Sequence, residues 1–220
     1  MKLFLGRAVV AELLGTAMLL AIVVGSGIMG ERLSQGNAAI ALLANSGATG
    51  AGLYVLIVIF GPISGAHFNP LVSWMEVGRG KLPVRSAAAY LCAQVSGAFA
   101  GVIAAHGMFG LPLVQFSSHL RSSADKCFGE MVASFGLILT IALASRFRAE
   151  SVPAAVAAYI SGAHWFTSST SFANPAVTMA RALTNTFAGI APQSVGLFVI
   201  GQIADAITAA FLVCCSSLTA

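Results

Sequence analysis

The chain has 220 residues, of which 58% are hydrophobic and only 8% are charged. Soluble domains carry roughly 25% charged residues, so this composition excludes a soluble globular surface and predicts an integral membrane protein. The net charge is +4, but the basic residues stand singly or in pairs. They do not form the basic patch of a nucleic-acid-binding protein, and we expect no nucleic-acid partner.

Six apolar stretches are candidates for transmembrane helices, because a span needs about 20 predominantly apolar residues. In chain order they are Leu5–Met29, Ala38–Phe60, Leu82–Gly107, Phe128–Ser145, Pro153–Phe166 and Val195–Ser216. The fifth stretch is short and must take residues from its flanks. Arg7 and Glu12 interrupt the first stretch and no small-residue cleavage site follows it. We therefore interpret it as a mature span and not as a removable signal peptide.

Two further apolar pieces, Asn69–Val77 and Asn174–Phe187, are too short to cross a membrane. Each begins with an Asn-Pro pair after a run of small and polar residues. Asparagine is a strong N-cap, and proline fits the first helical position because no donor is needed there. Non-helical backbone persists at membrane depth only where it lines a cavity or is buried in protein. The pattern predicts two re-entrant half-helices.

The order of these features repeats along the chain. The repeated features are an acidic residue in the first span of each half, the Asn-Pro pair, and a glutamine in the last span: Glu12 and Glu130, Asn69 and Asn174, and Gln94 and Gln202. Each half holds three spans, so the second half must be inserted upside down. Inverted repeats with matching broken helices place a substrate path at the bilayer midplane. We expect one channel domain, residues 1–220, with repeats at about 1–110 and 120–220.

The Asn-Pro pairs have a specific chemistry when two of them meet. The capping oxygen of each asparagine is engaged, so its amide NH₂ remains as a hydrogen-bond donor. Two half-helices from opposite sides also bring two positive dipole ends to the same point. Water or polyol hydroxyls can pass such a point, while protons and cations meet an electrostatic barrier.

These motifs resemble those of the aquaporin, or major intrinsic protein, family over nearly the whole chain, from Ala11–Thr16 through Ser64–Pro70 and Tyr90–Gly97 to Phe172–Ala176 and Gln202. The resemblance implies an all-α membrane protein of six transmembrane helices plus two half-helices. It also implies a homotetramer in the cell (inner or plasma) membrane, with one passive pore per subunit for water, glycerol and other small uncharged solutes. The four cysteines lack metal-binding spacing and no catalytic constellation is visible. We therefore expect no enzymatic activity, cofactor or metal ion.

The resemblance assigns roles to several polar residues. The pore motifs are Asn69, Pro70, Leu71, Asn174, Pro175 and Ala176. Glu12 and Glu130 would be costly in lipid if unpaired, so they should accept hydrogen bonds from backbone N–H groups of the re-entrant loops. Gln94 and Gln202 should give similar structural support, and His67 should brace its loop or line the pore.

The sequence departs from water channels of the family at the outer constriction. The arginine that usually follows the second Asn-Pro-Ala is Val177 here. An ungapped alignment on the Asn-Pro pairs places Thr49, Gly162 and Ser171 at the other constriction positions. Because the first two are small, we expect a wide pore that passes glycerol and metalloid hydroxides such as arsenous acid. The run from Asn174 to Arg181 also resembles bacterial aquaglyceroporins associated with arsenic resistance.

Three residues leave alternatives open. Arg181 lies one helical turn beyond Val177, either in the outer vestibule, where it could attract anions or replace the missing charge, or as a snorkelling interfacial residue. Leu71 stands where alanine is usual and could crowd the meeting of the half-helices. Asp205 replaces the glycine found at the matching position of the first half, and needs a partner or a raised pKa.

Two other functions compete with a broad neutral-solute channel. The first is a water-selective aquaporin. The second is a coupled secondary transporter, for which Glu12, Glu130 and Asp205 are the candidate ionisable groups. Charge also predicts orientation: Lys2, Arg7, Arg79, Lys81, Arg85, Arg146 and Arg148 fall on one side, and Arg32, Arg121, Lys126 and Arg181 on the other. This bias predicts that both termini are cytoplasmic.

Overall fold

The computed structural model describes the backbone of residues 2–215 and the side chains of residues 5–204, 206–209 and 211. The described chain is helical throughout, apart from its connections. In order, the helices are α1 (Lys2–Leu33), α2 (Ala38–Ser64), α3 (Pro70–Gly78), α4 (Val84–Met108), α5 (Ala124–Phe147), the 3₁₀ turn η1 (Ala149–Ser151), α6 (Val152–Phe166), α7 (Pro175–Ala180), the 3₁₀ turn η2 (Arg181–Leu183) and α8 (Pro192–Cys215).

The six predicted spans coincide with α1, α2, α4, α5, α6 and α8. Among the described residues, α1, α2, α4 and α5 are long and apolar enough to cross a membrane. The second half-helix is shorter than predicted: α7 ends at Ala180 and η2 at Leu183, not at Phe187. The chain turns tightly after η2, where a Cβ on Gly189 would lie 2.3 Å from the carbonyl oxygen of Thr184.

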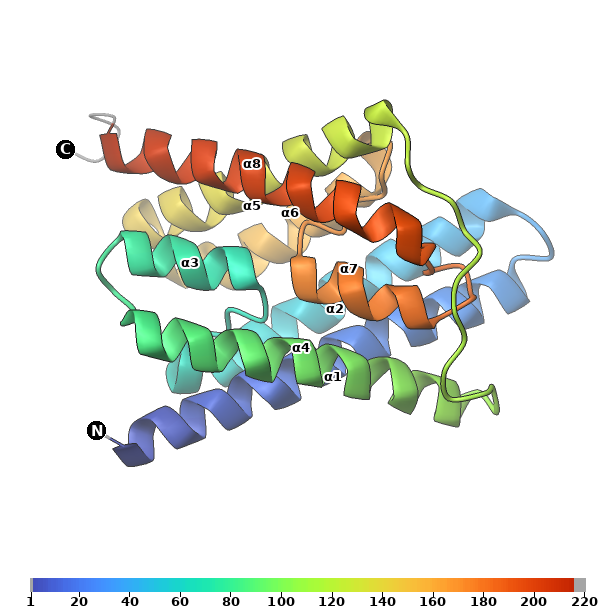
Figure 1. The fold of residues 1–220 in the computed structure, drawn as a ribbon, viewed down its shortest axis with the longest axis horizontal. Coiled ribbons are helices and arrows are strands. Elements are labelled where there is room, and N and C mark those ends of the chain that lie inside the picture. The colour runs from blue at the N-terminus through green and yellow to red at the C-terminus, as the bar shows by residue number, and fades with distance from the viewer. Residues whose placement is uncertain (1, 216–220) are drawn as a thin grey trace.

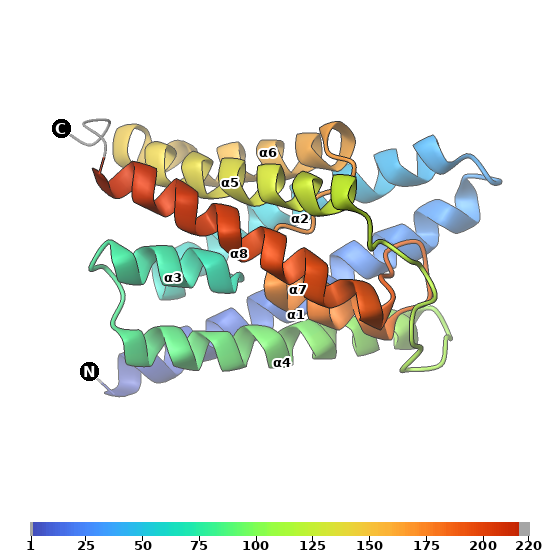
Figure 2. The same ribbon diagram turned by 45° about the horizontal axis from the view of Figure 1, so that its top comes forward.

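The two half-helices begin near the middle of the molecule and run to opposite ends (Figures 1 and 2). One end holds the start of α1, the α3–α4 and α5–α6 connections and the end of α8; we call it the N-terminal face. The other end, the opposite face, holds residues 34–37, 109–123 and 184–191. Each half-helix is capped by its asparagine, whose side-chain oxygen accepts from the backbone N–H two residues on, at 3.0 Å. The caps fix where each half-helix starts.

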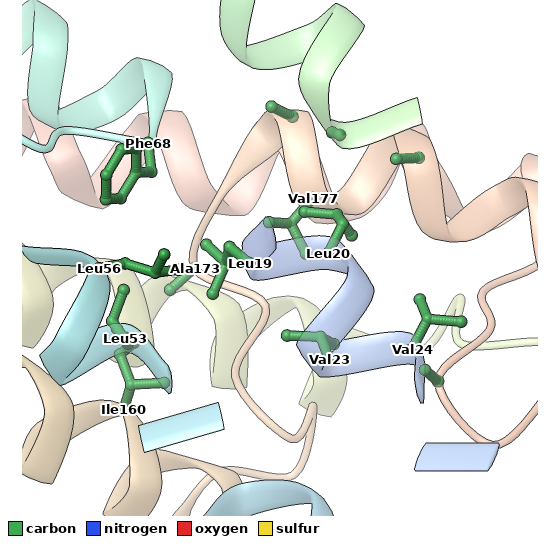
Figure 3. Close-up of a cluster of buried hydrophobic side chains, with 14 of the residues drawn as sticks. Leu19, Leu20, Val23, Val24, Leu53, Leu56, Phe68, Ile160, Ala173 and Val177 are labelled. Atoms are coloured by element: carbon green, nitrogen blue, oxygen red, sulfur yellow. The ribbon is translucent and has the colours of Figure 1, made fainter. Parts of the chain in front are cut away.

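Close backbone contact joins α1 to α4. A Cβ on Gly97 would lie 2.3 Å from the carbonyl oxygen of Leu13, and one on Gly101 would lie 2.2 Å from that of Ala17. Small residues of this kind allow helices to pack in lipid, where apolar side chains gain little by leaving the solvent. The packed interior holds Leu19, Leu20, Val23 and Val24 of α1 with Leu53 and Leu56 of α2, Phe68, Ile160 and Val177 (Figure 3).

Candidate pore and solute path

A cavity of about 100 Å³ lies between the helices where the two re-entrant loops meet. A single water needs at least about 10–15 Å³ of such space, so the cavity has room for several waters or one small solute. Its wall is formed by Leu19, Val23, Thr49, Leu53, Ile57, Gly65, Ala66, His67, Phe68, Asn69, Val72, Leu137, Ile141, Val152, Val156, Ile160, His164, Ser171, Phe172, Ala173, Asn174, Val177 and Arg181. The long helices contribute mostly apolar side chains, and the loops contribute polar groups.

Glu12 holds the first re-entrant loop from behind. The side chain is fully buried in α1. Its Oε1 accepts from the hydroxyl of Ser64 at 2.6 Å and from the backbone N–H of His67 at 2.9 Å. Its Oε2 accepts from the N–H of Phe68 at 2.7 Å and from Nε2 of Gln94 at 2.9 Å. These four hydrogen bonds compensate for the burial of the carboxylate.

Glu130 of α5 does the same for the second loop. It is fully buried, and its two oxygens accept from the backbone N–H groups of Phe172 at 2.8 Å and Ala173 at 2.9 Å. Nε2 of Gln202 donates to Glu130 and, at 2.8 Å, to the hydroxyl of Thr178 on α7. Both carboxylates are therefore occupied by structural hydrogen bonds, which does not favour their use as proton carriers.

The loops adopt a backbone conformation that few residues accept. Ala66, Phe68, Ser171 and Ala173 all have φ between 46° and 50°. Each such residue costs about 1–3 kcal/mol and persists only where the surrounding structure fixes it. Here the buried glutamates bind the loop N–H groups on one side. Some loop carbonyls accept no hydrogen bond from a described residue and belong to residues of the cavity wall, where they can accept from a solute: those of Gly65, Ala66, His67, Ser171 and Phe172.

The two asparagines tie the loops to each other. Nδ2 of Asn69 donates to the carbonyl oxygen of Ala173, and Nδ2 of Asn174 donates to that of Phe68, both at 2.8 Å. An amide nitrogen carries two hydrogens, so one N–H of each asparagine serves this cross-link. The other remains for the cavity that both residues line. The sequence pattern gave no hint of this cross-link.

Leu71 does not narrow the cavity. It packs with Val72 and Met75 of α3 and with Ile138 and Ala142 of α5. The same cluster includes small residues of α8, and Leu71 is absent from the cavity wall. The bulky side chain fills the space between α3, α5 and α8, so it does not crowd the meeting of the half-helices.

Three of the four predicted constriction residues lie on the cavity wall: Thr49, Ser171 and Val177. All three are buried, and the hydroxyls of Thr49 and Ser171 have no hydrogen-bond partner among the described residues. The expectation for Gly162 is wrong. Gly162 is exposed on the outer surface of α6, and Ile160 and His164 line the cavity in its place. Two residues along a helix correspond to about 200° of rotation. Gly162 therefore faces away from the cavity when Ile160 and His164 face it.

His164 is therefore a cavity residue that the alignment missed. Its Nδ1 lies 2.7 Å from the carbonyl oxygen of Ile160. A carbonyl only accepts, so Nδ1 carries the proton of the neutral ring and Nε2 is left as an acceptor. The signal was present in the sequence: Val152, Val156, Ile160 and His164 follow each other at four-residue spacing, which is typical of one helix face.

Arg181 lies in the cavity wall and is only 4% exposed. Its Nε donates to the carbonyl oxygen of Ala188, and the guanidinium carbon lies 3.4 Å from the centre of the Phe172 ring. A snorkelling side chain keeps its charged head in the interfacial region. The interpretation of Arg181 as a snorkelling residue is therefore wrong.

Arg121 braces the second loop from the opposite face. Its Nε donates to the carbonyl oxygen of Gly189 at 3.0 Å. One terminal nitrogen donates to the carbonyl oxygen of Ser169 at 3.3 Å and to the hydroxyl of Thr170 at 3.4 Å. Burial lowers the pKa of Arg121, and the nearby Glu130 carboxylate opposes this shift. From the sequence, Arg121 contributed only to the charge bias that predicts orientation.

His67 both braces the first loop and lines the cavity. Its Nδ1 lies 3.0 Å from the hydroxyl of Ser73, and its ring lies edge-on to Tyr90 with centroids 5.3 Å apart. Tyr90 in turn donates to the carbonyl oxygen of Ser64 at 2.9 Å.

The side chain of Asp205 lies outside the described part of the chain.

A second hollow of about 440 Å³ opens the path toward the N-terminal face. It shares Ile57, Gly65 and Val152 with the cavity. Its rim is formed by the end of α2, η1 and the start of α6, and includes Pro62 and Pro153. The cavity therefore continues into a mostly apolar mouth at this face.

The comparisons with known proteins agree with this geometry. The family model described as "Major intrinsic protein" matches residues 2–155. The chain is 52% identical over 205 residues to "Aquaglyceroporin AqpS" of Rhizobium meliloti (strain 1021), an alignment that covers 93% of this chain and 88% of that protein. It is 31% identical to "Probable aquaporin PIP2-8" of Oryza sativa subsp. japonica, over 64% of this chain and 52% of the relative. The X-ray structure of the aquaglyceroporin from Plasmodium falciparum has the same fold, with a TM-score of 0.76, 17% identity, and coverage of 98% of this chain and 99% of that one.

Proposed function

The chain belongs to the major intrinsic protein family, whose members are membrane channels for water and small uncharged solutes, and we propose that it is a broad neutral-solute member. It passes glycerol and undissociated metalloid hydroxides such as arsenous acid as well as water, and it excludes protons. The family membership rests on the match to residues 2–155 and on 52% identity to an aquaglyceroporin. The choice of solutes rests on the cavity wall.

The observation that carries the proposal is the chemistry of that wall. Thr49 and Val177 are small or neutral where a strict water filter has a bulky or charged side chain, and both line the cavity. Apolar side chains of α1, α2, α5 and α6 accept the C–H edge of a solute, while the loop carbonyls and the asparagine amides bind its hydroxyls. A solute that loses water on entry needs such replacements.

Arsenous acid fits the same description. It is an uncharged trihydroxide at neutral pH, so it presents hydroxyl groups to the loops without meeting the barrier that stops ions. The proposal for this solute rests on chemistry alone, since the relative's printed name specifies only an aquaglyceroporin.

Water selectivity is the second candidate, and one residue favours it. His164 lies on the cavity wall, where Gly162 was expected to leave space. An imidazole narrows the path and would act against larger solutes. A coupled transporter is less well supported, because Glu12 and Glu130 are occupied by the hydrogen bonds that hold the loops.

The proposal includes the setting of the channel. We place it in the cell membrane with the N-terminal face in the cytoplasm, since Arg79, Arg85 and Arg148 lie in or beside the connections at that face and positive residues favour the cytoplasmic side. We also propose a homotetramer with one pore per subunit, as in the family that the sequence resembles.

Uptake into proteoliposomes tests this function. Purified protein should raise the entry of glycerol and arsenous acid well above that of empty vesicles, and the rate should not change when a pH gradient is applied. Strong water flux without either solute would support the water-selective alternative. Solute accumulation that needs the pH gradient would support a coupled transporter.

A further inference from the structure

Among the described residues, the cavity wall contains one arginine, Arg181, to which the proposed function assigns no role. The guanidinium of Arg181 is buried and forms no ion pair with a described aspartate or glutamate, and the oxygens of the nearby Glu130 are occupied by the second loop and Gln202. A buried charge is costly unless it is paired or well hydrogen-bonded. The cost of burying Arg181 must be offset either by its contacts within the protein or by hydrogen bonds to a solute.

The contacts of Arg181 hold it in place. Nε donates to the carbonyl oxygen of Ala188, and the guanidinium carbon lies 3.4 Å from the centre of the Phe172 ring. The backbone of Arg181 is fixed as well, because its carbonyl oxygen accepts from the N–H of Ile190 at 3.2 Å. A planar guanidinium fixed at one edge and stacked on one ring keeps a defined direction.

Most of the donors of Arg181 remain unused. A guanidinium has five N–H groups, and only the one on Nε is bonded to a described residue. Some buried side-chain atoms of the described residues have neither a hydrogen-bond partner nor exposed surface, and the terminal nitrogens of Arg181 are not among them. These nitrogens therefore remain accessible. Because Arg181 lines the cavity, these nitrogens are placed to meet whatever occupies the pore. His164 offers an acceptor, its Nε2, on the same wall.

We propose that Arg181 determines specificity in the half of the pore between Asn174 and the opposite face. Its terminal nitrogens donate to the hydroxyl oxygens of a passing solute, and its charge repels cations before they reach the two asparagines. The solute part rests on the proposed function, because it assumes that polyols enter the pore. Val177 occupies the position at which the family usually has an arginine, and it supplies only an apolar surface.

Three substitutions separate the charge from the hydrogen bonds. Arg181→Met removes both, Arg181→Gln keeps a donor without the charge, and Arg181→Lys keeps the charge with a different donor geometry. Arg85→Met is the matched control, because Arg85 is exposed at the start of α4 and is not part of the cavity wall. Each protein is placed in vesicles, and sodium leak and the ratio of glycerol to 1,3-propanediol permeability are measured.

Loss of the charge should raise sodium leak about tenfold in the Met and Gln variants, a change that corresponds to about 1.4 kcal/mol in the barrier. The Lys variant and Arg85→Met should stay at the wild-type leak. The preference for glycerol, which has one more hydroxyl, should fall about threefold in the Met variant and remain in the Gln variant.

A folded Met variant with wild-type sodium leak and wild-type solute ratio would overturn the proposal. If Arg181→Met does not yield monodisperse protein, the Gln and Lys variants test the proposal instead. The same sodium leak in both variants would show that the charge of Arg181 does not repel cations. Wild-type vesicles that carry no glycerol would instead contradict the proposed function, and the sodium measurement would still test the charge of Arg181.

Discussion

The two re-entrant loops share one skeleton and differ in what surrounds it. In each, a buried glutamate accepts two backbone N–H groups, a glutamine donates to that glutamate, and an asparagine donates to the other loop. Even the valines three residues after the asparagines, Val72 and Val177, both line the cavity. The skeleton is therefore nearly symmetric and fixes the position of the pore.

The side chains around that skeleton are not symmetric. The first loop is braced by His67 and Tyr90, whose ring centroids lie 5.3 Å apart. The second is flanked by two arginines, Arg121 and Arg181, with guanidinium carbons 5.3 Å and 3.4 Å from the centre of the Phe172 ring. The repeated residues therefore form the channel, while the unrepeated ones give each end its own chemistry.

The largest expected effect comes from removing the glutamates. Glu12 accepts four hydrogen bonds and Glu130 accepts three. Each buried donor left without a partner costs about 1–3 kcal/mol. Both Glu→Ala variants should lose several kcal/mol of stability, and Glu12→Ala should lose more. Thermal unfolding in detergent measures this order. A more stable Glu12→Ala than Glu130→Ala would show that the count of hydrogen bonds does not set the difference between the loops.

A second comparison sets the α1–α4 contact against the α5–α8 contact. A Cβ on Gly101 would lie 2.2 Å from the backbone oxygen of Ala17, whereas one on Gly201 would lie 2.9 Å from that of Cys127. Overpacking typically costs about 1–3 kcal/mol. We expect Gly101→Ala near the upper end of that range and Gly201→Ala near the lower end. The midpoints of thermal unfolding of the two variants test this, and equal midpoints would mean that both halves are equally tight.

A smaller effect should follow from the residues that brace the loops. Tyr90→Phe removes one hydrogen bond, to the carbonyl oxygen of Ser64, and should cost about 1 kcal/mol. Arg121→Met removes bonds to Ser169, Thr170 and Gly189 and should cost more. The two variants are compared by unfolding and by glycerol flux. If Arg121→Met changed neither, the second loop would hold its shape without this brace.

Much of the skeleton was predictable because its physics is local and repeated. A carboxylate or an Asn-Pro pair inside an apolar stretch demands a partner or a cap, and seeing each feature twice predicted the family. The six spans and the start of both half-helices followed from the same pattern, and the structure has them at those places. The second half-helix ended earlier than predicted, α1 ended four residues later, and α6 gained only Val152 although the fifth stretch was expected to take more residues from its flanks.

The side chains that distinguish the two loops were harder to predict. Gly162 was chosen by counting from an aligned motif, but the face that a residue presents depends on where the helix lies, and His164 lines the cavity instead. Arg181 could have been interfacial or internal, because its burial depends on Phe172 and Ala188. His106 is a further example, because its ring nitrogens lie 3.0 Å from the carbonyl oxygen of Leu113 and 2.7 Å from the hydroxyl of Thr184. Thr184 is 78 residues from His106 in the sequence, so no local pattern reveals this partner.

The most direct test of the central claim is the ratio of glycerol to water permeability, measured by stopped-flow light scattering on vesicles that hold wild-type protein or Val177→Arg. The wild type should pass glycerol well above empty vesicles. The variant adds bulk and charge to the cavity wall that Thr49 and Ser171 also line, and its ratio of glycerol to water permeability should fall about tenfold while water still passes. A wild type that passes water but no glycerol, or a variant with an unchanged ratio, would contradict the claim that the side chains of this wall select the solute.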